Sequence, residues 1–214
     1  GIVDLNDTLG LHFWQAGAFN PVQLGTYMFL HAGFTHIFFN MFSLFIFGIT
    51  LERALGAQRY LFYYLSCGIG AALVQEVAWQ LSWQDMFVTD MAAANGTTAE
   101  QMTRLLADGQ LAEYAAQFKD MLVTVGASGA VFGILLAFGM LFPNVPMYII
   151  PFPFPIKAKW FVLGYVAIEF FSALGSSGDG VAHTAHLGGM LFGFLMIRYW
   201  NRHPNSGFDR GRGQ

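Results

Sequence analysis

One serine and one histidine stand at the starts of two apolar segments that carry glycines. Ser128 lies in the run VGASGAVFG, where its two neighbours on each side are Gly or Ala. Such small neighbours leave a hydroxyl accessible and let another backbone approach closely. His186 lies in the run AHTAHLGGMLFG, three residues before Gly189. Because a serine needs a base to become a nucleophile, we predict that His186 takes the proton of Ser128.

A second pair of polar residues could stabilise the negative charge that such an attack creates. His36 and Asn40 are four residues apart in an apolar segment, so they share one face of a helix. Both side chains can donate hydrogen bonds, which predicts an oxyanion role together with a backbone N–H near Ser128. No carboxylate adjoins His186 in the sequence, so we predict a Ser-His dyad rather than a triad. Glu169, inside another apolar segment, is expected to be structural.

The composition places these residues in a membrane. Of the 214 residues, 11% are charged and 55% are hydrophobic. Soluble domains carry about 25% charged residues, so this composition is typical of a membrane protein. The single cysteine, Cys67, cannot form a disulfide within the chain.

Five apolar segments are candidates for membrane-spanning helices, each of which needs roughly 20 residues with its flanks. They cover residues 24–51, 60–81, 123–142, 160–174 and 182–200. The polar residues 82–120 predict an insert outside the membrane, with one helix that is capped by Thr97 or Thr98 and continues through Leu106, and a second from Gln110 to Met121. We therefore expect an all-α, polytopic membrane bundle. Its parts are an extracytoplasmic stretch 1–23, a transmembrane domain 24–200 that includes the insert, and a disordered cytoplasmic tail 201–214.

The basic residues orient the five segments. Eight of the ten Lys and Arg follow the first segment, precede the fourth, or lie at or beyond the end of the fifth. The other two, Arg104 and Lys119, lie in the insert. The excess of positive charge in cytoplasmic loops then predicts a cytoplasmic C-terminus and an external insert. Ser128 and His186 would lie at similar depth near the outer face. We expect a multi-pass protein of the bacterial cytoplasmic membrane.

Four runs resemble the rhomboid family of intramembrane serine proteases, in the order in which that family carries them. They are TYMFLHAGFTHIFFNMFSLFIFG (26–48), LERALGAQRYLFYYL (51–65), GASGAVFG (126–133) and AHLGGMLFG (185–193). The resemblance covers most of the chain outside the insert and the tail. It implies that Ser128 is the nucleophile, that His186 is the general base and that His36 and Asn40 serve the oxyanion. It assigns supporting roles to His31, Gly126, Phe132 and Gly189, of which His31 is structural or holds water.

Four features depart from the family pattern. The family core has six helices, and the first of these is expected to be absent from this chain. Val22 precedes Gln23 where the family often has Trp, and Phe132 stands where it often has Tyr. The insert 82–120 is also unusually long. No proposed catalytic group is lost by these departures.

These features predict an intramembrane serine endopeptidase that cleaves transmembrane segments of other proteins near their outer ends. Its partners would be those substrates and the lipid bilayer, with no nucleic acid, no cofactor and no metal. The alternative is an inactive relative that binds or escorts membrane clients. A metal or haem protein using His31, His36, His183 and His186 is disfavoured, because the chain has no H-E-x-x-H motif. The substrate and the oligomeric state stay open.

Overall fold

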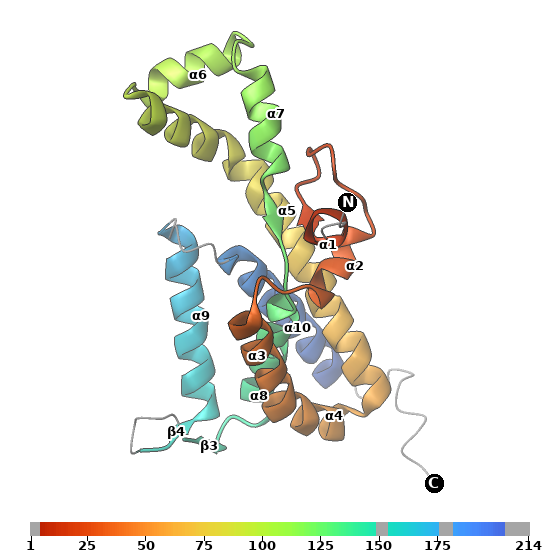
Figure 1. Ribbon diagram of the computed structural model, residues 1–214. Coiled ribbons are helices and arrows are strands. Elements are labelled where there is room, and N and C mark those ends of the chain that lie inside the picture. The colour runs from red at the N-terminus through yellow and green to blue at the C-terminus, as the bar shows by residue number, and fades with distance from the viewer. Residues whose placement is uncertain (1–4, 149–153, 176–181, 204–214) are drawn as a thin grey trace.

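The fold is a bundle of long helices, seen in a computed structural model that describes residues 5–148, 154–175 and 182–203. Figure 1 shows α9 at the edge of the bundle and α6 and α7 projecting beyond one end of it. The helices are α1 (Leu5–Leu9), α2 (Gln23–Thr26), α3 (Phe34–Ser43), α4 (Ile49–Leu55), α5 (Ala57–Asn95), α6 (Ala99–Ala107), α7 (Ala112–Asp120), α8 (Ser128–Leu141), α9 (Ala158–Leu174) and α10 (His183–Arg202). A 3-10 turn, η1 (Tyr27–Phe29), follows α2, and a π-helical turn, η2 (Leu44–Gly48), joins α3 to α4.

Each of the five predicted apolar segments is mainly helical, so the predicted all-α membrane bundle agrees with the structure. Among the described residues, two helical stretches are long and apolar enough on their own to cross a membrane, Phe34–Leu55 and Ala57–Asn95. The remaining apolar segments correspond to α8, which is apolar but has 14 residues, and to α9 and α10, with 17 and 20 residues.

The first two segments have different bounds from those expected. Residues 30–33 lie between η1 and α3 outside any helix, so His31 is in a connection and not on the helix that carries His36. The second segment was expected over 60–81, but α5 continues without a break through 39 residues to Asn95. At 1.5 Å per residue α5 is about 58 Å long, well beyond the roughly 30 Å of a hydrocarbon core.

The predicted insert, residues 82–120, consists of the last part of α5 and two short helices beyond its end. Gly96 adopts a left-handed conformation with φ of 63° and ends α5. Thr98 caps α6: its side chain accepts a hydrogen bond from the backbone N–H of Gln101, whose own side chain accepts from Thr98 N–H. Of the two residues that the sequence offered as caps, Thr98 is therefore the one used.

The third apolar segment begins as a strand. β2 (Val123–Thr124) pairs antiparallel with β1 (Leu11–His12), with Leu11 opposite Thr124. The helix that was expected from residue 123 therefore starts at Ser128, because the preceding backbone is taken up by this pairing. A second short pair, β3 (Pro146–Met147) with β4 (Ile156–Lys157), leads from α8 toward α9.

Gln23 fixes the N-terminal stretch above the bundle. Its side chain is only 2% exposed. The side-chain amide donates to the carbonyl oxygens of Thr8 and Ala18, at 3.1 and 3.0 Å. Its carbonyl oxygen accepts from the backbone N–H groups of His12 and Asn20. One buried side chain thus satisfies four backbone groups of this stretch that lie outside a helix or sheet ladder bond.

The core of the bundle is built on close contact between α8 and α10, with α5 packed against both. A Cβ atom added to Gly189 would collide with the carbonyl oxygen of Gly129. A Cβ on Gly133 would lie 2.6 Å from Cys67 Sγ and 3.0 Å from Gly189 O. Tyr63 of α5 donates its hydroxyl to Gly133 O at 2.7 Å. Backbones this close are possible only where side chains are missing.

Replacing Gly189 by Ala should therefore destabilise the bundle. Because the obstacle is backbone and not a flexible side chain, we expect Gly189→Ala to cost about 1–3 kcal/mol of unfolding free energy. Gly164→Ala is the matched control, since a Cβ on Gly164 of α9 meets nothing within 4 Å. Thermal unfolding in detergent should show a lower midpoint for Gly189→Ala and no loss for Gly164→Ala. Equal midpoints would contradict the tight α8–α10 contact.

Candidate active site

Ser128 is the first residue of α8, and the chain reaches it through an unusual turn. Gly126 has φ of 130°, a region that residues with a Cβ rarely adopt. The Gly126 N–H donates to Tyr27 O at 2.9 Å, which ties the turn to the segment before α3. The backbone therefore arrives from the β1–β2 pair and turns into α8 directly at the serine.

His186 lies in the first turn of α10 and faces Ser128. Its Nε2 is 2.8 Å from Ser128 Oγ, a hydrogen-bonding distance. The His186 side chain is largely buried, with 7% exposed. The structure thus brings together two residues that are 58 positions apart in the sequence.

Phe132 fixes the plane of the His186 ring. It lies one turn after Ser128 on α8, and its ring stacks on the imidazole with 4.3 Å between centroids and 22° between planes. The ring of Tyr165 on α9 is also in contact with Phe132, tilted by 56° with 6.0 Å between centroids. The aromatic stacking expected at this position is therefore present without a hydroxyl.

His36 is placed against the turn that precedes Ser128. The Ala32 N–H donates to His36 Nδ1 at 3.3 Å, so the proton of the neutral ring lies on Nε2. A Cβ on Gly126 would lie 2.7 Å from that Nε2 and 3.7 Å from Ser128 Oγ. The N–H donor of His36 thus lies beside the backbone that leads into the serine.

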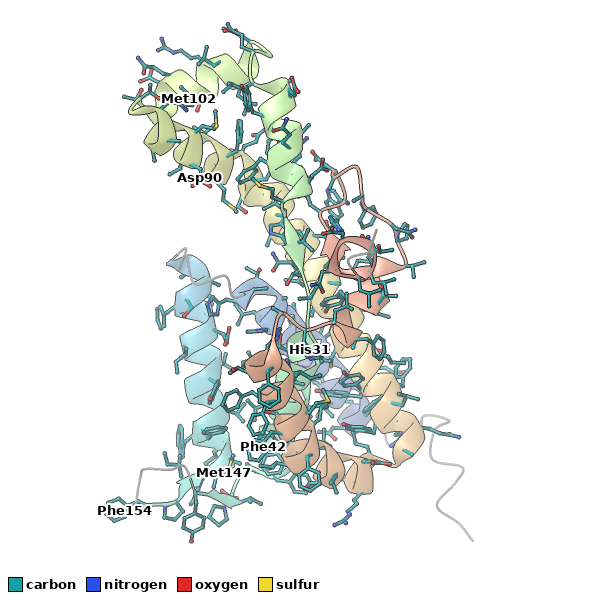
Figure 2. The ribbon with its side chains drawn as sticks, in the orientation of Figure 1. His31, Phe42, Asp90, Met102, Met147 and Phe154 are labelled. Atoms are coloured by element: carbon teal, nitrogen blue, oxygen red, sulfur yellow. The ribbon has the colours of Figure 1, made fainter. Side chains whose placement is uncertain are left out.

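Asn40 and His31 contact His36 from two sides. The Asn40 side chain is 5% exposed, and its Nδ2 donates to the His36 backbone carbonyl at 3.0 Å. One amide hydrogen is therefore used within α3. The His31 ring meets the His36 ring edge-on, with 5.1 Å between centroids. Figure 2 shows His31 at the end of α3 where the chain enters that helix.

Glu169 is the part of this site that sequence reasoning missed. Its Oε2 lies 2.9 Å from His186 Nδ1 and 2.7 Å from His183 Nδ1. The carboxylate is 5% exposed and comes from α9. A lone acidic residue in an apolar segment was a usable signal, because buried charges at membrane depth nearly always have a partner. Two histidines one turn apart at the start of the next helix supplied that partner.

The same three residues have the chemistry of a metal site. The ligand atoms of Glu169, His183 and His186 all lie within 4.8 Å of one another. Imidazole nitrogens and a carboxylate oxygen suit zinc and similar ions. These atoms are already joined by hydrogen bonds within the group, so they are satisfied without an ion. That the protein uses no metal stays a prediction.

Comparison with known proteins identifies the family. The rhomboid domain model matches residues 18–202, most of the chain. The chain belongs to the rhomboid family. This rhomboid is 28% identical over 172 residues to the rhomboid protease AarA of Providencia stuartii, which covers 79% of the chain and 52% of that protein. It is also 28% identical over 191 residues to RHOMBOID-like protein 6, mitochondrial, of Arabidopsis thaliana, covering 89% of the chain and 47% of the relative.

A third relative is similar to the same degree. Rhomboid protein 1, mitochondrial, of Saccharomyces cerevisiae is 28% identical over 169 residues, covering 78% of the chain and 38% of that protein. The chain thus spans about half or less of the length of these curated relatives. No solved structure gives a significant match. Rhomboids are embedded in membranes, which agrees with the composition and the long apolar helices of this chain.

Gly126 offers a test of the turn before Ser128. Ala at this position would be strained by the positive φ and would also push against the His36 ring, 2.6 Å away at Cε1. Gly109 is the matched control, because it has φ of 76° and open space around it. We expect Gly109→Ala to cost about 1–2 kcal/mol from strain alone. Gly126→Ala should lower the free energy of unfolding by about 1–3 kcal/mol more than that, seen as a lower unfolding midpoint. Equal losses of stability in the two variants would contradict the contact between His36 and Gly126.

Proposed function

We propose that this rhomboid is an intramembrane serine endopeptidase that cleaves transmembrane segments of other proteins near their outer ends. The observation that carries the proposal is the 2.8 Å contact between Ser128 Oγ and His186 Nε2. A hydroxyl becomes a useful nucleophile when a neighbouring base accepts its proton. The similarity to a protein named as a rhomboid protease supports the same reaction class.

The proposed reaction passes through an acyl-enzyme. Ser128 Oγ attacks the carbonyl carbon of the scissile peptide while His186 Nε2 takes the hydroxyl proton. The imidazolium returns that proton to the leaving amine, and the C–N bond breaks. Water then attacks the ester, again with His186 as base, and releases Ser128 and the new carboxyl end.

The oxyanion of each tetrahedral intermediate needs donors that are in place before the reaction. The Nε2–H of His36 lies beside the turn at Gly126, and the first backbone N–H groups of α8, which have no partner within that helix, follow the same turn. We assign the second amide hydrogen of Asn40 to the same role, because the bond to the His36 carbonyl uses only the first. Fixed donors of this kind stabilise charge that develops only in the transition state.

An apolar recess beside Phe132 suits the side chain of a membrane segment. It has a volume of ≈ 100 Å³. It is lined by Ser43, Phe47, Val131, Phe132, Leu135, Phe161 and Tyr165. Phe132 also stacks on His186, so a side chain in this recess would contact the ring that packs against the base. The surface of α3 outside the recess is strongly apolar, as around Phe42 in Figure 2, and suits contact with lipid.

The setting proposed for this reaction is the bacterial cytoplasmic membrane with the C-terminus in the cytoplasm. The bias of Lys and Arg toward the junction of α4 and α5, the junction of β4 and α9, and the end of α10 with the residues beyond it supports this orientation. The insert helices α6 and α7 would then lie outside the cytoplasm, as would the end of the bundle that holds Ser128.

Loss of the serine hydroxyl should abolish cleavage and leave the fold intact. The test uses purified protein in liposomes with a single-pass reporter helix that has small residues near its outer end. We expect no product from Ser128→Ala. Ser82→Ala is the control and should cleave normally, because the described contacts of the Ser82 hydroxyl, with the Ala78 carbonyl and the Met86 sulfur, both lie within its own helix. Normal cleavage by folded Ser128→Ala would refute the assignment. Binding of the reporter without cleavage by the wild type would favour the client-binding alternative.

The oxyanion donors should matter for rate and not for folding. We expect His36→Ala and Asn40→Ala each to slow cleavage by roughly 10²-fold or more, as loss of one oxyanion donor does. Asn95→Ala is a matched control, since Asn95 makes the same bond to a carbonyl four residues earlier, Met91 O, on an exposed helix end. An unchanged rate in Asn40→Ala would leave that residue with a structural role only.

A further inference from the structure

We infer that Glu169 is a positioning residue that holds His186 in the form needed for a base, so that the site is a Ser-His-Glu array and not a dyad. The inference rests on the proposed protease function and deepens it. Its physical basis is one carboxylate oxygen, Glu169 Oε2, within hydrogen-bonding distance of two imidazoles from the next helix.

The contacts define the tautomer of His186. An ionised carboxylate only accepts hydrogen bonds, so His186 Nδ1 must carry the proton that it donates to Glu169. The neutral ring then has its lone pair on Nε2, the atom 2.8 Å from Ser128 Oγ. Without the carboxylate, a neutral imidazole can place its proton on Nε2, where it cannot accept from the serine. Glu169 therefore selects the tautomer that can act as a base.

The contact also becomes stronger as the reaction proceeds. When His186 takes the serine proton, an imidazolium forms 2.9 Å from the Glu169 oxygen. Both side chains are more than 90% buried, so little water screens this ion pair. A contact that is stronger in the transition state than in the ground state lowers the barrier to reaction. A contact that is equally strong in both states does not.

His183 completes the arrangement by holding the carboxylate. It lies one turn before His186 on α10, and its Nδ1 donates to the same Glu169 oxygen at 2.7 Å. The two rings are nearly perpendicular, at 89° with centroids 6.1 Å apart. With His183 on one side and His186 on the other, the oxygen has little freedom to rotate away. His183 thus acts through Glu169 and not on the substrate.

A purely structural role is the rival explanation. Within α9 the buried residues are Ala158, Val162 and Glu169, so the carboxylate also links α9 to α10. The substitution Glu169→Gln separates the two roles, because it keeps the size of the side chain and one acceptor oxygen but removes the charge. If the role of Glu169 is structural only, Glu169→Gln should change the stability of the protein but not the tautomer of His186.

The first test measures the tautomer directly. Histidine labelled with ¹⁵N in both ring nitrogens, observed by NMR in detergent, reports which nitrogen of His186 carries the proton. The His186→Gln spectrum identifies the signals. We expect Nδ1–H in the wild type and a shift toward Nε2–H in Glu169→Gln. An unchanged His186 tautomer would overturn the inference, and this readout does not require activity.

The second test measures cleavage of the liposome reporter. We expect Glu169→Gln to lower kcat by at least about 10²-fold with KM nearly unchanged, as loss of the carboxylate does in serine protease triads. Glu169→Asp should recover part of the rate. Glu76→Gln is the matched control: Glu76 is a buried carboxylate on α5 that accepts from the Trp14 N–H at 2.8 Å, outside this site.

The outcomes separate this inference from the proposed function. If the wild type fails to cleave but the His186 tautomer shifts in Glu169→Gln, the protease proposal is refuted and the positioning role stands. If the wild type cleaves and Glu169→Gln has the same kcat, the positioning role is refuted and the protease proposal stands. Equal effects of Glu169→Gln and Glu76→Gln on kcat would also contradict the inference, because Glu169 bonds to His186 whereas Glu76 bonds to the Trp14 backbone.

Discussion

The whole site depends on how closely the backbones of α8 and α10 approach each other. At Gly129 and Gly189 there is no room for a Cβ atom. Ser128 adjoins one of these glycines, and His186 lies one turn before the other. The packing that stabilises the bundle is therefore the same packing that sets the Ser128–His186 distance. A membrane interior offers little hydrophobic drive for helix association, so small residues and interhelical hydrogen bonds take its place.

The polar residues of the site stabilise one another in an apolar bundle. His36 accepts from the Ala32 N–H, Asn40 donates to a carbonyl of its own helix, and Glu169 joins two imidazoles. Buried polar groups are costly unless they are paired, so each of these contacts offsets part of the cost of burial. The arrangement also fixes the orientation of each group before any substrate is bound, which is what transition-state stabilisation requires.

Much of this architecture could be predicted from the sequence, because apolar length and charge bias follow from the bilayer itself. The residues at which the helices begin could not be predicted in this way. α8 begins at Ser128 only because residues 123–124 pair with a strand more than a hundred positions away, and α3 begins after an extended connection that holds His31. The role of Glu169 depends on how α9 packs against α10, which hydropathy does not encode. His36 and Gly126 likewise meet only in the folded bundle.

The most direct measurement of the central claim is labelling with a fluorophosphonate probe, which reacts covalently with activated serines and needs no knowledge of the substrate. Folded protein in detergent would be treated with the probe and the adduct located by mass spectrometry. The account predicts one adduct on Ser128 that disappears in His186→Ala. An adduct on Ser128 that forms equally fast without His186, or no adduct in folded wild-type protein, would contradict it.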